Sequence, residues 1–249
     1  MTWHPCIRPA DSTTTTVIPH PRTYATMRTH QTGSMPSPDL QVDPYCLLED
    51  DLKDVYDYIR KALRRNTYQD SLYEIATYYF DGHGKAVRPM VTILMARAIN
   101  YHICKENGGL MKSQREVAMI SEMIHTASLV HDDVIDQSDF RRGKPSVNVK
   151  WNHKKVTMAG DFILAVASMM ISRIRNNDVT LVLSQVVTDL VQGEFMQLGA
   201  KETENERFAH YLTKTYRKTA SLKANSLKAV SFNLYSQHFT DKAINLFDI

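Results

Sequence analysis

Three aspartates stand close together near the end of one apolar-striped segment of the chain. The segment runs from Met123 to Asp136, and Asp132 and Asp133 also fall within its last five positions. In a helix Asp132 and Asp136 share one face, whereas Asp133 is displaced by about 100° and is expected to support the pair. The helix macrodipole disfavours negative charge at this end, so a cation must neutralise the cluster. Oxygen ligands of this kind suit Mg²⁺, held by one or two carboxylates together with substrate phosphates.

Basic residues directly follow the aspartates and favour a diphosphate site over a solvated acidic turn. Arg141, Arg142 and Lys144 lie on a loop shaped by Gly143 and Pro145. Arginine suits bidentate contacts with phosphate oxygens. Carboxylates for a metal ion beside arginines for phosphate therefore predict a site for a metal-bridged diphosphate.

A second basic cluster lies upstream, between Gly82 and Pro89. The glycines free the backbone, and Pro89 can occupy the first turn of the next helix, which places Lys85 and Arg88 near a helix N-terminus. Such a terminus is itself an anion-binding site. Alone the string is a weak signal, because a solvated basic loop has the same composition and the spacing is not that of a nucleotide P-loop.

Helices must position these side chains. From Leu47 onward prolines almost vanish and apolar residues recur every three or four positions, which predicts helices. The expected helices span about 47–65, 69–81, 88–103, 112–136, 155–175, 178–199 and 205–230. No alternating strand pattern of useful length appears. We therefore expect a single all-α bundle whose site is built from side chains that face inward on neighbouring helices.

The composition excludes several classes of protein. The 249 residues are 43% hydrophobic, with 30 basic against 27 acidic side chains, so the chain is neither fibrous nor wholly disordered and gives no general nucleic-acid signal. Three widely spaced cysteines form neither a disulfide framework nor a C-x-x-C metal pattern. The most apolar run, residues 162–171, is shorter than the roughly 20 residues that span a bilayer, so no transmembrane helix is expected.

The first 45 residues differ from the rest of the chain. Seven of the nine prolines lie in the first 44 residues, together with a run of four threonines, so this stretch cannot form a packed layer. Residues 1–38 hold three arginines and one acidic residue, a composition typical of an organelle transit peptide. We expect residues 1–45 to be a disordered tail, either a mitochondrial transit segment or a plain tail of a cytoplasmic protein. Residues 46–249 form the helical domain.

Six short motifs occur in order along this domain. They are G-K-x-x-R-P at 84–89, M-I-H-T-A-S-L-V-H-D-D-V-I-D at 123–136, R-R-G-K at 141–144, A-G-D at 159–161, G-E-F-M-Q-L at 193–198 and K-T-A at 218–220. Together they resemble the trans-prenyltransferases, and more narrowly the long-chain polyprenyl diphosphate synthases of the decaprenyl type, which serve ubiquinone biosynthesis. The resemblance covers about residues 47–230 and implies an isoprenoid-synthase bundle around a central cavity.

The resemblance implies Mg²⁺-dependent, head-to-tail condensation of isopentenyl diphosphate with an allylic diphosphate, in a homo-oligomer or with a second synthase subunit. By motif position, Asp132 and Asp136 would ligate Mg²⁺, and Arg141 would hold the allylic diphosphate. Lys218 and Thr219 match a family pair that contacts the allylic diphosphate and faces the developing cation. The residues implied to hold isopentenyl diphosphate are Lys85, Arg88, His125 and Arg142.

Residues that precede Asp132 by one or two helical turns are expected to face the same cavity. His125 lies seven residues before Asp132, and its alternative is a hydrogen-bonded core histidine. Ala127 and Ser128 lie one turn before Asp132, where the short-chain synthases of the family carry bulky aromatics. Two small residues here predict an open tunnel and a long product, unless they merely permit close helix packing.

The sequence departs from the family after Val230. The second aspartate-rich segment of the family is not found there, only the isolated Asp241 and Asp248. The bundle is therefore expected to be C-terminally incomplete, with some apolar helix faces uncovered. Two functions remain: a prenyltransferase, or a truncated non-catalytic subunit that binds a diphosphate or a partner chain without turnover. A terpene cyclase shares D-D-x-x-D but needs no second diphosphate site, so the set of Lys85, Arg88 and His125 argues against it.

Overall fold

A computed structural model describes residues 43–82, 84–104, 109–199 and 207–232. The chain divides into two compact units, Met1–Leu47 and Leu48–Ile249. Within the first unit the structure describes only residues 43–47, which contain the short helix α2 (Pro44–Leu47). The tail expected over residues 1–45 falls outside the described residues except at its last three positions, and it stays a prediction.

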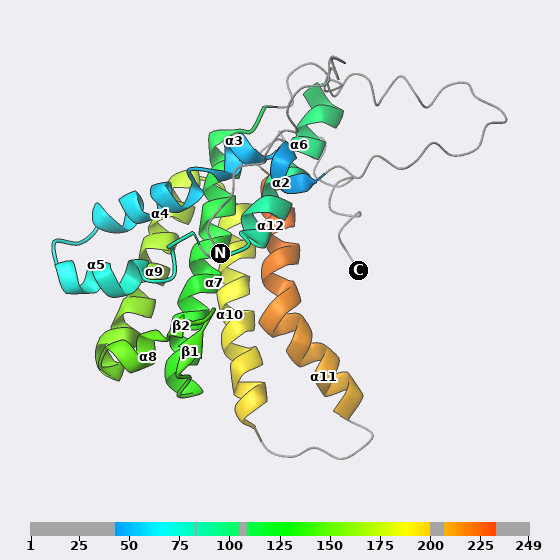
Figure 1. Ribbon diagram of the computed structural model, residues 1–249. Coiled ribbons are helices and arrows are strands. Elements are labelled where there is room, and N and C mark those ends of the chain that lie inside the picture. The colour runs from blue at the N-terminus through cyan, green and yellow to red at the C-terminus, as the bar shows by residue number, and fades with distance from the viewer. Residues whose placement is uncertain (1–42, 83, 105–108, 200–206, 233–249) are drawn as a thin grey trace, which may run out of the picture. The chain divides into compact units, whose positions relative to one another are not determined.

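The described part of the second unit is built almost entirely of helices, as expected from the sequence. In chain order, which Figure 1 shows from blue to orange, they are α3 (Glu49–Leu52), α4 (Val55–Arg64), α5 (Asp70–Thr77), α6 (Val87–Cys104), α7 (Lys112–Ile135), α8 (Val147–Lys150), α9 (His153–Ile174), α10 (Asn177–Leu198), α11 (Arg207–Thr215), the π-helical turn η1 (Tyr216–Ala220) and α12 (Ser221–Phe232). The all-α prediction is confirmed. Within the described ranges the strands are only a two-residue pair, β1 (Phe140–Arg141) and β2 (Lys144–Pro145), which the sequence pattern did not predict.

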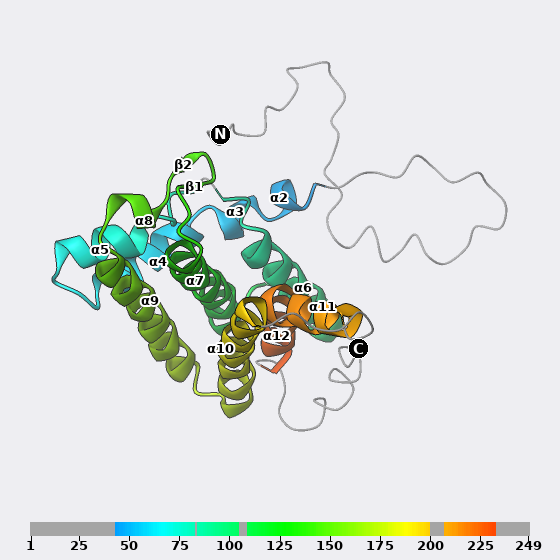
Figure 2. The same cartoon turned by 90° about the horizontal axis from the view of Figure 1, so that it is seen from below.

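Helix α7 is the central helix of this unit. It packs against α6, α9 and α12, and the view along the bundle in Figure 2 shows it between α9 and α6. Ile120, Met123, Ile124 and Ala127 of α7 are at most 1% exposed. Burial of each large side chain contributes about 1.5–3 kcal/mol, so a long, well-packed α7 holds its C-terminal aspartates in fixed positions.

The predicted helix boundaries are correct where the apolar periodicity stops at a real helix end. Four helices, expected over 88–103, 112–136, 155–175 and 178–199, lie within two residues of these bounds. The tight α9–α10 joint explains two of these ends. Arg175 closes α9 in the left-handed conformation, and the Asn176 side chain accepts a hydrogen bond from the Val179 amide at the start of α10.

Two other predicted boundaries are wrong, because the apolar spacing of the sequence continues past the point where a helix ends. The helix expected over 47–65 is two helices, α3 and α4, yet Leu52, Val55 and Ile59 keep the helical spacing across the break. The helix expected over 69–81 ends at Thr77. The carbonyl groups of Tyr78 and Phe80, which follow it, instead accept hydrogen bonds from the side chains of basic residues elsewhere in the chain.

Helix α9 is the one helix of the described ranges that is long and apolar enough to cross a membrane. Length and composition alone support that reading. The buried residues of α9, among them Val156, Ile163 and Val166, belong to the side that packs on α7 and α5, as in the core helix of a bundle.

Candidate active site

The C-terminal end of α7 concentrates negative charge, part of which is buried. Asp132 is partly buried, and Asp136, the C-cap of α7, is exposed and donates its backbone N–H to the carbonyl of Asp132 over 2.8 Å. Burial, together with the charges of Glu194 and Asp136, raises the pKa of Asp132 to about 6, although Lys218 opposes this shift. A cation placed beside Asp132 would offset both effects.

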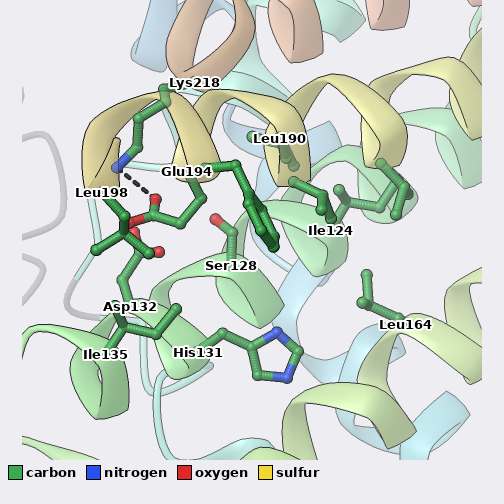
Figure 3. A pocket seen from close by; sticks show the side chains of 13 residues that line it. Ile124, Ser128, His131, Asp132, Ile135, Leu164, Leu190, Glu194, Leu198 and Lys218 are labelled. Atoms are coloured by element: carbon green, nitrogen blue, oxygen red, sulfur yellow. Dashed lines mark ion pairs between the residues drawn. The ribbon is translucent and has the colours of Figure 1, made fainter. Parts of the chain in front are cut away.

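Asp132 stands at the polar end of a cavity between α7, α9 and α10. The cavity has a volume of about 210 Å³, and Figure 3 shows Asp132, Glu194 and Lys218 together at one end of it. Apart from Ser128 and His131, the other lining residues are apolar: Ile124, Ile135, Leu164, Val187, Leu190, Val191, Phe195 and Leu198. The cavity therefore suits a ligand with a charged head and a hydrocarbon body.

Lys218 is held opposite Asp132 by two acceptors on α10. Its Nζ lies 2.5 Å from Oε2 of Glu194 and donates a hydrogen bond to Oε1 of Gln197 over 2.7 Å. A Cβ atom at Gly193 would lie 2.8 Å from Cγ of Lys218, so this glycine lets η1 approach α10. A π-helical turn such as η1 is frequent at functional sites. The adjacent Thr219 is exposed.

The donor set at this end fits Mg²⁺. Asp132, Asp136 and Glu194 offer only carboxylate oxygens, and Oε1 of Glu194 is buried without a hydrogen-bond partner in the described part of the chain. No group of three or more His, Cys, Asp or Glu side chains among those residues is arranged to hold a metal by itself. Mg²⁺ ordinarily takes one or two carboxylates and completes its coordination with phosphate oxygens and water.

Asp133 supports the site rather than facing the cavity. It is fully buried, accepts a hydrogen bond from the Tyr79 hydroxyl, and pairs with Arg141 through Nε at 2.7 Å and Nη2 at 2.6 Å. The Tyr79 hydroxyl also accepts a hydrogen bond from the Val147 amide over 3.0 Å. The supporting role expected for Asp133 stays a prediction. Of the Arg141 guanidinium, only the Nη1 group lies outside the pair, and its role toward an allylic diphosphate stays a prediction.

Arg142 occupies the tip of the β1–β2 hairpin. Arg142 and Gly143 have φ angles of +53° and +76°, and Arg141 pairs with Lys144 across the hairpin, which is a type I′ turn. A Cβ atom at Gly84 would lie 2.8 Å from Nη1 of Arg142. This close approach brings the two basic loops predicted from the sequence together, and a side chain at Gly84 would displace the end of the Arg142 side chain.

The basic side chains continue behind Arg142 on the side of α7 that faces α6 and α12. Burial lowers the pKa of Arg88, whose Nε is buried without a hydrogen-bond partner in the described ranges. Burial and the charges of Arg88 and Arg142 also lower the pKa of His125 to about 3. His125 is therefore neutral near pH 7 and can offer one N–H donor, but no charge. Lys85 is exposed on the neighbouring loop.

Two residues before Asp132 do not lie where the helical spacing predicted. The cavity lining includes Ser128 but neither His125 nor Ala127. His125 instead belongs to the cluster of Arg88 and Arg142, and Ala127 is completely buried in the core. The reason is that α7 has helices on several sides. Residues one position apart point in directions about 100° apart, so one can face the cavity while its neighbour packs against another helix.

Three residues of the site were not singled out from the sequence. Glu194 lies in the motif at 193–198, where an acidic residue within a helix that carries an apolar stripe was the available signal. Glu122 carries the same signal in α7; it is 3% exposed and accepts a hydrogen bond from the Tyr56 hydroxyl over 3.2 Å. Burial raises the pKa of Glu122, and Arg88 and Arg142 oppose this shift. Tyr79 has no comparable signal in the sequence.

A helical bundle with acidic groups at the head of an apolar cavity, and basic groups beside them, is the architecture of isoprenoid synthases. The chain belongs to the polyprenyl synthetase family, whose profile matches residues 69–246.

Relatives with assigned names support this membership. The human all trans-polyprenyl-diphosphate synthase PDSS1 is 57% identical over 189 residues, which cover 76% of this chain and 45% of that protein. Decaprenyl-diphosphate synthase subunit 1 of Schizosaccharomyces pombe is 37% identical over 209 residues, covering 74% of this chain and 54% of the relative. The chain thus spans about half the length of the curated relatives it matches.

Solved structures share the fold. A decaprenyl diphosphate synthase from Rhodobacter capsulatus matches with a TM-score of 0.65 and 28% identity, over 76% of this chain and 55% of that chain. A polyprenyl synthase from Caulobacter crescentus, solved in complex with calcium and isoprenyl diphosphate, matches with a TM-score of 0.68 and 26% identity, over 84% of this chain and 61% of that chain.

Proposed function

We propose that the protein is a Mg²⁺-dependent trans-prenyltransferase that condenses isopentenyl diphosphate with allylic diphosphates into a long polyprenyl diphosphate for ubiquinone biosynthesis. One observation supports this proposal most directly. Carboxylates and a lysine stand at the head of an apolar cavity, and a separate cluster of Arg88 and Arg142 lies around His125 of α7. The first arrangement suits the allylic substrate with its hydrocarbon tail. The second suits another diphosphate, which a cyclase would not need.

The residues at the acidic end of the cavity would assist the departure of the allylic diphosphate. Asp132 and Asp136 would hold Mg²⁺ with Glu194 nearby, and the bound metal would offset the charge that builds on the departing diphosphate. Lys218 is fixed at the same end of the cavity and would offer a further positive charge to that group. The apolar walls keep water away from the allylic cation. No nucleophilic side chain is required.

The basic cluster would bind isopentenyl diphosphate. Arg88 and Arg142 can each make bidentate contacts with phosphate oxygens, and neutral His125 can donate one hydrogen bond. Lys85, exposed on its loop, is free to fold over the bound anion. The buried Glu122 lies behind the two arginines and limits their mutual repulsion before substrate arrives.

The names of two relatives bear on the partners of the protein and on its location in the cell. We propose that the protein works in a homo- or hetero-oligomer with a second synthase subunit, in mitochondria. The fission yeast relative is named as a subunit 1, and a relative from Neurospora crassa is named a probable mitochondrial hexaprenyl pyrophosphate synthase. Both statements belong to those relatives and support the proposal for this chain.

An isotope-incorporation assay tests the proposal. Labelled isopentenyl diphosphate and an allylic diphosphate are supplied with Mg²⁺ to the wild type and to Asp132→Ala, and calorimetry measures the binding of each diphosphate. We expect the substitution to lower turnover by more than about 100-fold, or roughly 2.7 kcal/mol.

Asp139→Ala is the matched control, because Asp139 does not line the cavity. Turnover of Asp132→Ala within about tenfold of wild type would contradict the metal assignment. Binding of both diphosphates without product would identify a non-catalytic subunit instead.

A further inference from the structure

We propose that Lys144 is a positioning residue that clamps the β1–β2 hairpin to the segment after α5 and thereby fixes the isopentenyl diphosphate site. The inference rests on the proposed function of that site. Lys144 belongs to the R-R-G-K motif, and neither the mechanism above nor the motif assignment gives it a role.

The ammonium group of Lys144 is fully engaged within the protein. Its Nζ donates a hydrogen bond to the backbone carbonyl of Tyr78 over 2.7 Å and forms an ion pair with Asp81. It also lies 3.8 Å from the centroid of the Tyr78 ring, a cation–π contact. The Lys144 and Asp81 side chains are only 26% and 24% exposed, so water screens their attraction weakly. Lys144 is thus placed to hold structure, and not to receive a diphosphate.

The clamp joins the two loops that form the basic cluster. On one side it holds the hairpin, and the Tyr78 hydroxyl strengthens the junction by donating to the carbonyl of Pro145 over 2.8 Å. On the other side Asp81 directly precedes Gly82, which has a φ angle of +82° and begins the loop that carries Gly84. The contact between Gly84 and Arg142 therefore depends on the clamp that lies at the base of both loops.

The hairpin tip needs such support. Arg142 has a φ angle of +53°, a left-handed conformation that disfavours a residue with a Cβ atom. Arg142 is exposed, and the two-residue strands beside it are short. Arg141 is different, because its pair with the buried Asp133 anchors it independently of Lys144. Loss of the clamp should consequently displace Arg142 more than Arg141.

Because Arg142 should move more than Arg141, loss of the clamp should affect one diphosphate more than the other. Calorimetry with Mg²⁺ measures the binding of isopentenyl diphosphate and of geranylgeranyl diphosphate to the wild type and to Lys144→Met. Hydrogen–deuterium exchange follows the amides of residues 138–147 in the same proteins. We expect Lys144→Met to weaken isopentenyl diphosphate about tenfold, to change the allylic ligand less than about threefold, and to speed exchange in the hairpin. Lys144→Arg should retain most of the affinity.

A neighbouring lysine supplies the matched control. Lys150 also places its Nζ over the Tyr78 ring, at 4.6 Å, and over Trp151, at 4.7 Å, but it belongs to α8. Lys150→Met should leave both affinities and the hairpin exchange unchanged. Should Lys144→Met fail to fold in a thermal melt, Asp81→Asn weakens the same ion pair from the other side and should produce the same selective loss.

Two results would overturn the clamp: unchanged exchange across residues 138–147, or equal weakening of the two diphosphates. Failure of the proposed function has a different signature, because the wild type would then bind neither diphosphate. The exchange measurement would still decide whether Lys144 holds the hairpin.

Discussion

Residues of α7 that are close in sequence have very different electrostatic surroundings. Asp132 faces the cavity and its pKa is raised, whereas the next residue, Asp133, is buried in a pair with Arg141. One and two turns earlier, Ser128 lines the cavity while His125 lies among positive charges. A single helix therefore offers an acidic face and a neutral hydrogen-bond donor to the two proposed anion sites.

The neutral state of His125 makes a prediction about acid stability. Its folded-state pKa lies near 3, below the ordinary value of 6.5, so the unfolded chain takes up a proton at a higher pH than the folded protein. The protein should accordingly lose stability as the pH falls below 6.5, because protonation then favours the unfolded state. At pH 5 this residue alone accounts for a loss of up to about 2 kcal/mol relative to pH 7.

Urea unfolding at pH 7 and pH 5 measures this loss in the wild type and in His125→Gln. The variant should lose less stability between the two pH values, and the comparison cancels the opposite effect of groups such as Asp132, whose pKa is raised. Equal losses in the two proteins would show that His125 titrates normally, and that the positive cluster of Arg88 and Arg142 does not act on it.

At the scale of elements, the sequence predicts long helices well because each needs one periodic apolar stripe. The helix over 112–136 follows from this rule, and so do the motifs at its end. The rule fails for η1, since a π-helical turn keeps an almost helical spacing, and for the hairpin, whose turn is Arg-Gly rather than the familiar Asn-Gly. The exact face of α7 that each residue occupies also depends on packing partners that sequence spacing does not specify.

Close packing of α9 on α7 explains the glycine of the A-G-D motif. A Cβ atom at Gly160 would lie 2.3 Å from Nε2 of His131, which lines the cavity and approaches the Thr157 carbonyl at 3.1 Å. Gly160→Ala must displace this ring at a cost of about 1–3 kcal/mol, while alanine gains about 1 kcal/mol of helix propensity inside α9. We therefore expect a net destabilisation of up to about 2 kcal/mol in urea unfolding. Gly109→Ala is the control, because no described residue has an atom within 4 Å of its Cβ position. Equal stability of the two variants would mean that the ring of His131 moves freely.

The faces of α7 also revise the expectation about product length. Ser128 lines the cavity, whereas Ala127 is completely buried away from it. Ser128→Phe should therefore obstruct the cavity and shift products toward shorter prenyl chains, as chromatography of the products would show. Ala127→Phe should mainly overpack the core, at a cost of about 1–3 kcal/mol in unfolding free energy. A long-chain distribution from Ser128→Phe would show that the growing chain follows another path.

At the scale of the whole unit, the two proposed anion sites tie together helices that are distant in sequence. The acidic site joins α7 to α10 and η1, and the basic site joins the loop before α6 to the hairpin after α7. A ligand in either proposed site would contact several helices at once. Ligands that bind only the folded protein raise its stability by mass action, about 2.7 kcal/mol at a concentration of 100 times Kd.

Removal of the metal should affect the two proposed sites differently, and the melting temperature of the protein can show this. We expect isopentenyl diphosphate and geranylgeranyl diphosphate each to raise the melting temperature in the presence of Mg²⁺. EDTA should abolish the shift caused by the allylic ligand, because Asp132 and Asp136 repel its diphosphate once no cation lies between them. The shift caused by isopentenyl diphosphate should largely persist, since Arg88 and Arg142 attract the anion directly. Equal sensitivity of both shifts to EDTA would indicate that the diphosphates share one metal-dependent site, and the division of α7 into two binding faces would then be wrong.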